Sequence, residues 1–272
     1  MSVGQIETGI KMDTPGQAGL QERKDIVFCC AYAALITAAE VVVGYGNIVI
    51  GMLIHACLLI AVLAHSSLAG RTETSKMLLT LALAPLIRMM SLAMPLAGIP
   101  VYYWYAVIGS PLIAATITVA RLNSYKAPEL GFNFSKIPGQ LLFGLVGIGL
   151  GYIEYMILKP QAIITPVTLG NIWLPAIILL VFTGLMEELA FRGVMFKAFA
   201  DGVGSKFAVL YVSYIFAVLH ITHLKILDIF FVFAVALLFT YAYKRFGTII
   251  GITLAHGMTN TFLYIVWPNF LK

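Results

Sequence analysis

Nine long apolar stretches dominate the chain and limit the folds that it can adopt. Their predicted limits are Ile26–Gly44, Ile48–His65, Met77–Ala97, Val101–Ala120, Gly139–Leu158, Leu174–Phe196, Phe207–His220, Ile226–Tyr243 and Thr248–Trp267. Most of them approach the roughly 20 residues that a helix needs to cross a bilayer. The sequence therefore predicts an all-α, polytopic integral membrane protein with about eight to nine transmembrane helices.

Composition excludes two other classes of protein. Of the 272 residues, 61% are hydrophobic and only 11% are charged, whereas a soluble domain carries about 25% charged residues. The net charge of +5 does not indicate a nucleic-acid partner, because the basic residues are dispersed among the predicted loops. The lipid bilayer is the expected environment of most of the chain.

The distribution of basic residues predicts an orientation in the membrane. Of the 17 Lys and Arg residues, twelve fall in the tail and loops of one side, three fall on the other side, and two lie inside apolar stretches. Short cytoplasmic loops carry an excess of Lys and Arg. We therefore expect a cytoplasmic N-terminus and a C-terminus on the opposite side.

The sixth apolar stretch contains three charged residues, Glu187, Glu188 and Arg192. Each such residue at the centre of a spanning helix costs about 2.5–3.5 kcal/mol on insertion scales, so all three should face the protein interior. Glu188 and Arg192 are four residues apart, which predicts an ion pair on one helix face. Glu187 lies roughly 100° round the helix and is a candidate general base. A buried ion network that only fixes helix packing is the alternative interpretation.

Two later stretches supply polar groups that complement this carboxylate. His220 lies near the end of the seventh stretch, and His256 and Asn260 are four residues apart in the ninth, on one helix face. Amide hydrolysis needs an activated water and donors for the oxyanion. We expect Glu187 to take a proton from water that His220 positions, while His256 and Asn260 donate to the oxyanion. The four residues predict a polar cavity within the membrane.

Three motifs in this order resemble the CAAX prenyl endopeptidases of type II, the Ras-converting-enzyme-like branch also called CPBP intramembrane proteases. The motifs are Glu187-Glu188-x-x-x-Arg192, Phe216-x-x-x-His220 and His256-x-x-x-Asn260. The resemblance implies that the first glutamate and first histidine activate water and that the second histidine and the asparagine stabilise the oxyanion. It also implies that Glu188 and Arg192 support the site.

The resemblance further implies an activity and a substrate. It implies an intramembrane endopeptidase that needs no cofactor and cuts a prenylated CAAX protein or peptide near its C-terminus. Three segments follow from the motifs: a flexible cytoplasmic tail at residues 1–25, motif-free transmembrane helices at 26–138, and CAAX-protease-like catalytic helices at 139–272.

Other functions remain compatible with the same residues. A zinc peptidase would find N and O ligands among Glu187, His220, His223 and His256, but the sequence has no His-Glu-x-x-His motif, and we expect no metal. A proton-coupled transporter could use glutamate and histidine as a proton relay. A non-enzymatic immunity or scaffold protein could bind a peptide in the same cavity.

Isolated polar residues and prolines occur in the other stretches. The isolated polar residues are Glu40, His55, Arg88 and Glu154. We expect them to have structural roles and to pair between spans, with Glu40 and Arg88 as one possible bridge. Pro85 and Pro95 predict kinks in the third stretch.

Overall fold

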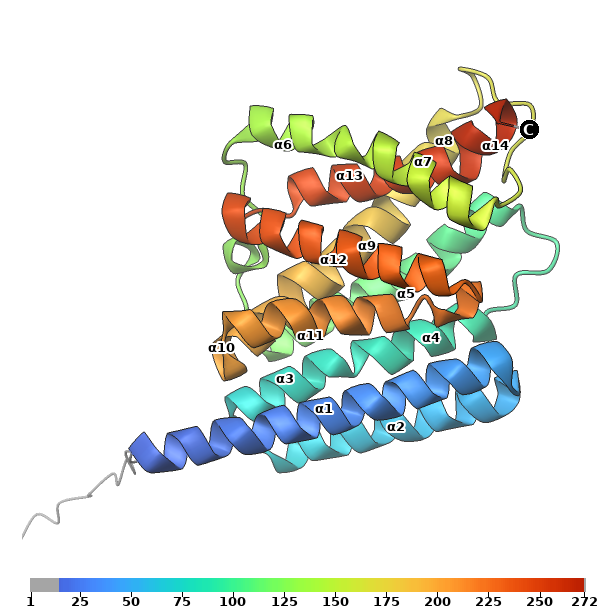
Figure 1. Cartoon of the computed structure of the whole chain (residues 1–272). Helices are drawn as coiled ribbons and strands as arrows, with labels where there is room; N and C mark the ends of the chain where they lie inside the picture. The colour runs from blue at the N-terminus through green and yellow to red at the C-terminus, as the bar shows by residue number, and fades with distance from the viewer. Residues whose placement is uncertain (1–14, 272) are drawn as a thin grey trace, which may run out of the picture.

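A computed structural model of the chain describes residues 15–271 (Figure 1). Within this range it contains helices and no strand, so the predicted all-α fold is confirmed. The α-helices are α1 (Pro15–Tyr45), α2 (Ile48–Leu68), α3 (Glu73–Leu81), α4 (Leu83–Ala93), α5 (Val101–Leu122), α6 (Ile137–Gly144), α7 (Val146–Leu158), α8 (Trp173–Leu179), α9 (Met186–Glu188), α10 (Phe196–Val203), α11 (Ser205–Val218), α12 (Ile226–Phe246), α13 (Ile250–Thr261) and α14 (Trp267–Phe270). Tighter or wider helical turns connect or interrupt them: η1 (Ala127–Leu130), η2 (Leu180–Leu185), η3 (Leu189–Met195), η4 (Ile221–His223) and η5 (Phe262–Val266).

Eight helices of the described range are long and apolar enough to cross a membrane. They overlap the first eight predicted stretches and show a multi-pass membrane protein. The sixth of these helices runs through α8, η2, α9, η3 and α10 and is called the sixth span below. The ninth predicted stretch is also helical from residue 250 to residue 270. It is not among the eight, because polar residues such as His256 and Asn260 lower its hydropathy.

The structure corrects the predicted tail and the predicted kink at Pro95, whereas the helix is interrupted near Pro85 as expected. Helix α1 begins at Pro15, so residues 15–25, which were expected in a flexible tail, are helical; the rest of that predicted tail lies outside the described residues. In the third stretch, α3 and α4 meet at Ala82, since the ring of Pro85 collides with the carbonyl four residues earlier. Pro95 lies beyond the end of α4 at Ala93 rather than kinking the helix.

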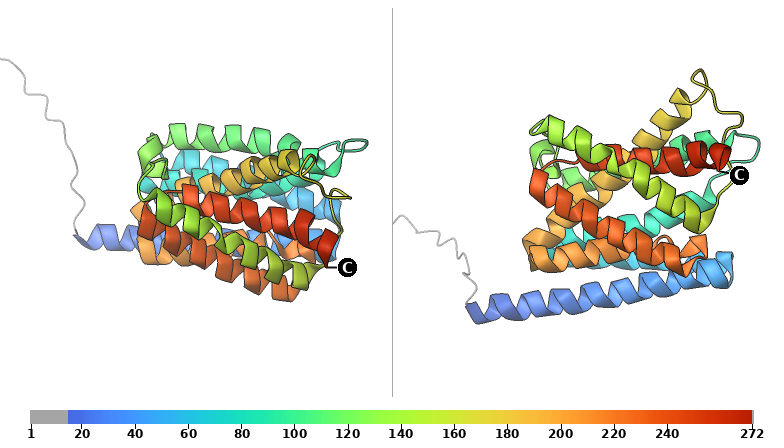
Figure 2. Two further views of the ribbon diagram at one scale, coloured as in Figure 1. Left: turned by 90° about the horizontal axis from the view of Figure 1, so that it is seen from above. Right: turned by 45° about the horizontal axis from the view of Figure 1, so that its top comes forward.

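The helices run roughly alongside one another in a bundle (Figures 1 and 2). The α1–α2 hairpin forms one edge, α6 and α7 lie at the opposite edge, and α13 packs against α6, α7 and the sixth span. Helix α1 begins at the opposite end of the bundle from the C-terminus (Figure 1). Which end faces the cytoplasm stays a prediction, as does the division of the chain at residue 138.

Glycines allow the sixth span and α13 to approach closely. A Cβ atom on Gly184 would lie 3.0 Å from the Thr253 carbonyl oxygen, and one on Gly257 would lie 2.9 Å from the Leu180 Cα. Small residues permit such close backbone contact between membrane helices. The contact brings the glutamates of the sixth span next to the histidine and asparagine of α13.

Candidate active site

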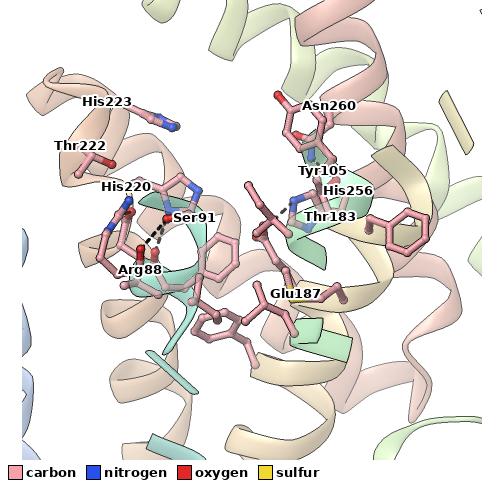
Figure 3. Close-up of a pocket in the computed structure, with 18 of the residues that line it drawn as sticks. Arg88, Ser91, Tyr105, Thr183, Glu187, His220, Thr222, His223, His256 and Asn260 are labelled. Atoms are coloured by element: carbon pink, nitrogen blue, oxygen red, sulfur yellow. Dashed lines mark hydrogen bonds and ion pairs between the residues drawn. The ribbon is translucent and has the colours of Figure 1, made fainter. Parts of the chain in front are cut away.

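A cavity of about 270 Å³ lies inside the bundle between α4, α5, α7, the sixth span, α11 with η4, and α13. This volume is large enough to hold several waters. All four residues predicted to act in catalysis line it: Glu187, His220, His256 and Asn260. Figure 3 shows His220 on one wall, and His256 and Asn260 on the other. The structure therefore brings the four residues to one cavity within the membrane-spanning bundle.

The Glu187 carboxylate faces this cavity rather than lipid. Its Oε2 atom lies 3.7 Å from Nε2 of His256, and its side chain is 22% exposed. By contrast, the neighbouring side chain of Glu188 is completely buried. The two adjacent acids thus lie in different environments, as the helical geometry predicted.

The predicted ion pair between Glu188 and Arg192 is present, and it has a third member. Oε1 of Glu188 accepts from Nη1 of Arg192 at 3.0 Å and from Nδ1 of His256 at 2.8 Å. Arg192 is also fully buried, donates to the Ala236 carbonyl, and stacks its guanidinium 4.5 Å from the centre of the Phe216 ring. The bond to His256 was not predicted, because spacing within one helix does not reveal partners on another.

This contact fixes the orientation of the His256 ring. A carboxylate can only accept, so Nδ1 of His256 carries the hydrogen that is donated to Glu188. The other nitrogen, Nε2, is then directed toward Glu187 and the cavity. A carboxylate behind a functional histidine in this way selects its tautomer and orientation. Glu188 is therefore both the counterion of Arg192 and the group that aligns His256.

Asn260 is held by Thr183, a residue that the sequence analysis missed. The Thr183 hydroxyl donates to the Leu179 carbonyl, and Nδ2 of Asn260 donates to the Thr183 oxygen at 2.8 Å. Because the hydroxyl hydrogen is already used, the Thr183 oxygen can only accept, and this sets which way the amide points. Thr183 is four residues before Glu187 and so lies on the same helix face. The four-residue spacing from Glu187 could therefore have indicated that Thr183 faces the site.

If Asn260 has the oxyanion role predicted from the sequence, Thr183→Val is expected to lower turnover while leaving the fold unchanged. Valine matches threonine in shape but cannot accept from Asn260, so the amide loses its fixed direction. Removal of a single oxyanion donor lowers kcat by about 10²–10³-fold. Because the amide of Asn260 is loosened and not removed, we expect kcat to fall by at least about tenfold, and by no more than that range. The measurement is kcat on a cleavable peptide. Thr183→Ser is the control and should retain the wild-type rate; equal loss in both variants would contradict the role.

His220 presents an unprotonated nitrogen to the cavity. Its Nδ1 atom lies 2.8 Å from the Phe216 carbonyl oxygen, which can only accept, so Nδ1 carries the hydrogen. In the neutral ring Nε2 then has a free lone pair. Among the residues that the structure describes, no hydrogen bond joins His220 to Glu187, and the two line the same cavity. A water between them is the arrangement that the expected chemistry needs.

Helices outside the three motifs hold the segment that carries His220. Nε of Arg88 on α4 donates to Oε1 of Glu40 on α1 at 2.8 Å, and Nη2 of Arg88 forms an ion pair with Oε2 of Glu40, also at 2.8 Å. It also donates to the Leu219 carbonyl, one residue before His220. His55 on α2 places Nε2 3.3 Å from the same carboxylate. The predicted Glu40–Arg88 bridge is thus present and extends to the wall of the cavity.

Two further acidic or basic groups reach this cavity. Glu154 of α7 lines it, as does His223 of η4. Within residues 15–271, no group of three or more His, Cys, Asp or Glu side chains has an arrangement that could hold a metal ion.

The fold and the site together define a multi-pass, all-α membrane protein with a glutamate, histidine and asparagine cavity inside its bundle. Residues 169–262 match the family model described as type II CAAX prenyl endopeptidase Rce1-like. The matched segment contains all three motifs, so the predicted resemblance to this family is confirmed over these residues. Neither the curated proteins nor the solved structures gave a match to the chain.

Proposed function

We propose that the protein is an intramembrane endopeptidase of the CAAX-protease type, which hydrolyses a peptide bond near the C-terminus of a prenylated protein or peptide. The observation that carries the proposal is the convergence of Glu187, His220, His256 and Asn260 on one buried cavity. Polar and ionisable groups inside a membrane bundle are costly and mark functional sites. The Rce1-like family match supports a protease as the general class.

In the proposed first step, a water in the cavity is activated for attack on the peptide carbonyl. Glu187 accepts one proton of the water, and Nε2 of His220 accepts a hydrogen bond from it and aligns its oxygen. The geometry supports these roles because the Glu187 carboxylate faces the cavity and Nε2 of His220 has a free lone pair. General acid–base catalysis of this kind contributes about 10²–10⁴-fold to a rate.

In the same step, the carbonyl oxygen gains negative charge and needs donors. The proposed donors are Nε2 of His256, once the ring is doubly protonated, and the second hydrogen of the Asn260 amide. The carboxylates of Glu187 and Glu188 on either side of the ring favour its positive charge. Pre-oriented donors aimed at a developing oxyanion make the largest single contribution to transition-state stabilisation in many such reactions.

A prenylated substrate suits a site at this depth. Its isoprenoid can stay among the acyl chains of the bilayer, while the polar peptide enters the cavity. Transfer of a lipid chain out of water is worth about 0.8 kcal/mol per CH₂, so the membrane would concentrate such a substrate near the protein.

The test uses the purified full-length protein in detergent and a fluorogenic farnesylated CAAX peptide. We expect cleavage that persists after treatment with a metal chelator, with the same peptide lacking the farnesyl group as a comparison. Cleavage that the chelator abolishes and Zn²⁺ restores would instead assign the reaction to a metal. Binding of the peptide without any cleavage would favour the peptide-binding scaffold.

A further inference from the structure

A second histidine–carboxylate pair borders the same cavity. Nδ1 of His223 lies 2.7 Å from Oδ2 of Asp228. Asp228 is fully buried in the first turn of α12, and its other oxygen, Oδ1, has no hydrogen-bond partner among the described residues. A helix N-terminus favours a negative charge at this position. The carboxylate can therefore act as a fixed anion behind the imidazole.

The His223 ring is accessible from the cavity, unlike its partner. Its side chain is 30% exposed and lines the cavity, and Figure 3 shows the ring extending from the wall that also carries His220. Because Asp228 accepts the hydrogen of Nδ1, Nε2 is the atom left to exchange a proton. A buried carboxylate in this position fixes the tautomer and orientation of the imidazole. His223 can thus hold a proton at Nε2 and release it into the cavity.

The proposed hydrolysis leaves one task without a group. Glu187 and His220 handle the attacking water, and His256 and Asn260 serve the oxyanion, but an amine leaves an acyl carbon readily only after its nitrogen is protonated. The centre of the His223 ring lies 5.2 Å from that of His220, with the two rings perpendicular. This places a proton donor beside the group that aligns the water.

We infer that His223 is a catalytic residue that protonates the departing amine, and that Asp228 is its positioning residue. The inference rests on the proposed function. When the tetrahedral intermediate breaks down, the C–N bond cleaves and the nitrogen takes the proton from Nε2 of His223, giving a free amine, a carboxylic acid and a neutral imidazole. The proton that Glu187 took from water then passes through cavity water to His223. Both groups return to their starting states, and one water is consumed per bond.

The test compares two substrates that differ only in the leaving group. The cleaved bond of a farnesylated CAAX peptide is first located by mass spectrometry with the wild type, and a matched peptide is made with an ester at that bond. An alkoxide leaves with less need of a proton donor than an amine. We therefore expect His223→Gln to lose about 10²-fold or more of amide turnover, the range of general acid catalysis, and to cleave the ester within a few-fold of wild type. Asp228→Asn should show the same dependence on leaving group.

The controls separate this inference from the proposed function. His65→Gln, a histidine of α2 that bonds Tyr32 away from the cavity, should cleave both substrates as wild type does. Ester turnover by His223→Gln would itself show that the rest of the site is folded. Equal loss on both substrates, or loss on neither, overturns the inference and leaves the proposed function standing. The inference would also be overturned if Glu154→Gln, and not His223→Gln, lost amide turnover while keeping ester turnover. A wild type that cleaves neither substrate would overturn both.

Discussion

Glu187→Gln is expected to remove peptide cleavage while the protein keeps its fold. Glutamine has nearly the shape of glutamate but cannot accept a proton from water, so the loss should be roughly 10²–10⁴-fold, the contribution of a general base. The fold should survive because the carboxylate faces the cavity and its nearest charged partner, Nε2 of His256, is 3.7 Å away. The measurements are the turnover of a farnesylated peptide and the thermal unfolding midpoint in the same detergent.

The matched control is Glu73→Gln, the same substitution at an exposed position of α3. It should leave turnover unchanged. If Glu187→Gln still turns over substrate at the wild-type rate, Glu187 is not the base and the proposed mechanism fails at its first step.

Glu188→Ala is expected to destabilise the protein, and to inactivate it as well. The substitution leaves the guanidinium of Arg192 buried without its counterion, and breaking a buried pair by removing one partner costs about 3–5 kcal/mol. It also removes the acceptor of Nδ1 of His256, so the ring loses its fixed orientation. The measurements are yield of folded protein, the unfolding midpoint and peptide turnover.

A double variant separates the two roles of Glu188. In Glu188→Met with Arg192→Met, no charge is stranded, and apolar replacement of a buried ion pair is often neutral or stabilising. We expect stability near wild type without recovery of activity, because His256 still lacks its carboxylate. A Glu188→Ala protein that is as stable and as active as wild type would refute both roles.

The sequence predicted the site where its geometry is local to one helix. The i, i+4 spacing gave the Glu188–Arg192 pair and the free face of Glu187, and the order of motifs gave the shared cavity. The bonds from Glu188 to His256 and from Asn260 to Thr183 join different helices. Spacing along the chain can place Thr183 on the same helix face as Glu187, but it does not show which side chain of another helix bonds to it, so both contacts emerged only in three dimensions.

The helix boundaries predicted from the sequence were wrong for a related reason. Hydropathy reports where a chain enters lipid, and not where its backbone stops being helical. Helix α1 therefore extends back to Pro15, through the charged residues Arg23 and Lys24, although the apolar stretch begins at Ile26. The helix from residue 250 to residue 270 shows the converse, since polar residues such as His256 and Asn260 make this predicted ninth stretch less apolar than the eight spans.

The contact of Arg88 with the Leu219 carbonyl has a consequence for the way this protein could be rebuilt. The family match covers residues 169–262, yet the turn that carries His220 is anchored from α1, α2 and α4 through Glu40, His55 and Arg88. A chimera that grafted the matched segment onto foreign leading helices would keep every motif and lose this anchorage. The first helices and the matched segment should therefore be inherited together, and a change at Arg88 should have to be matched by one at Glu40.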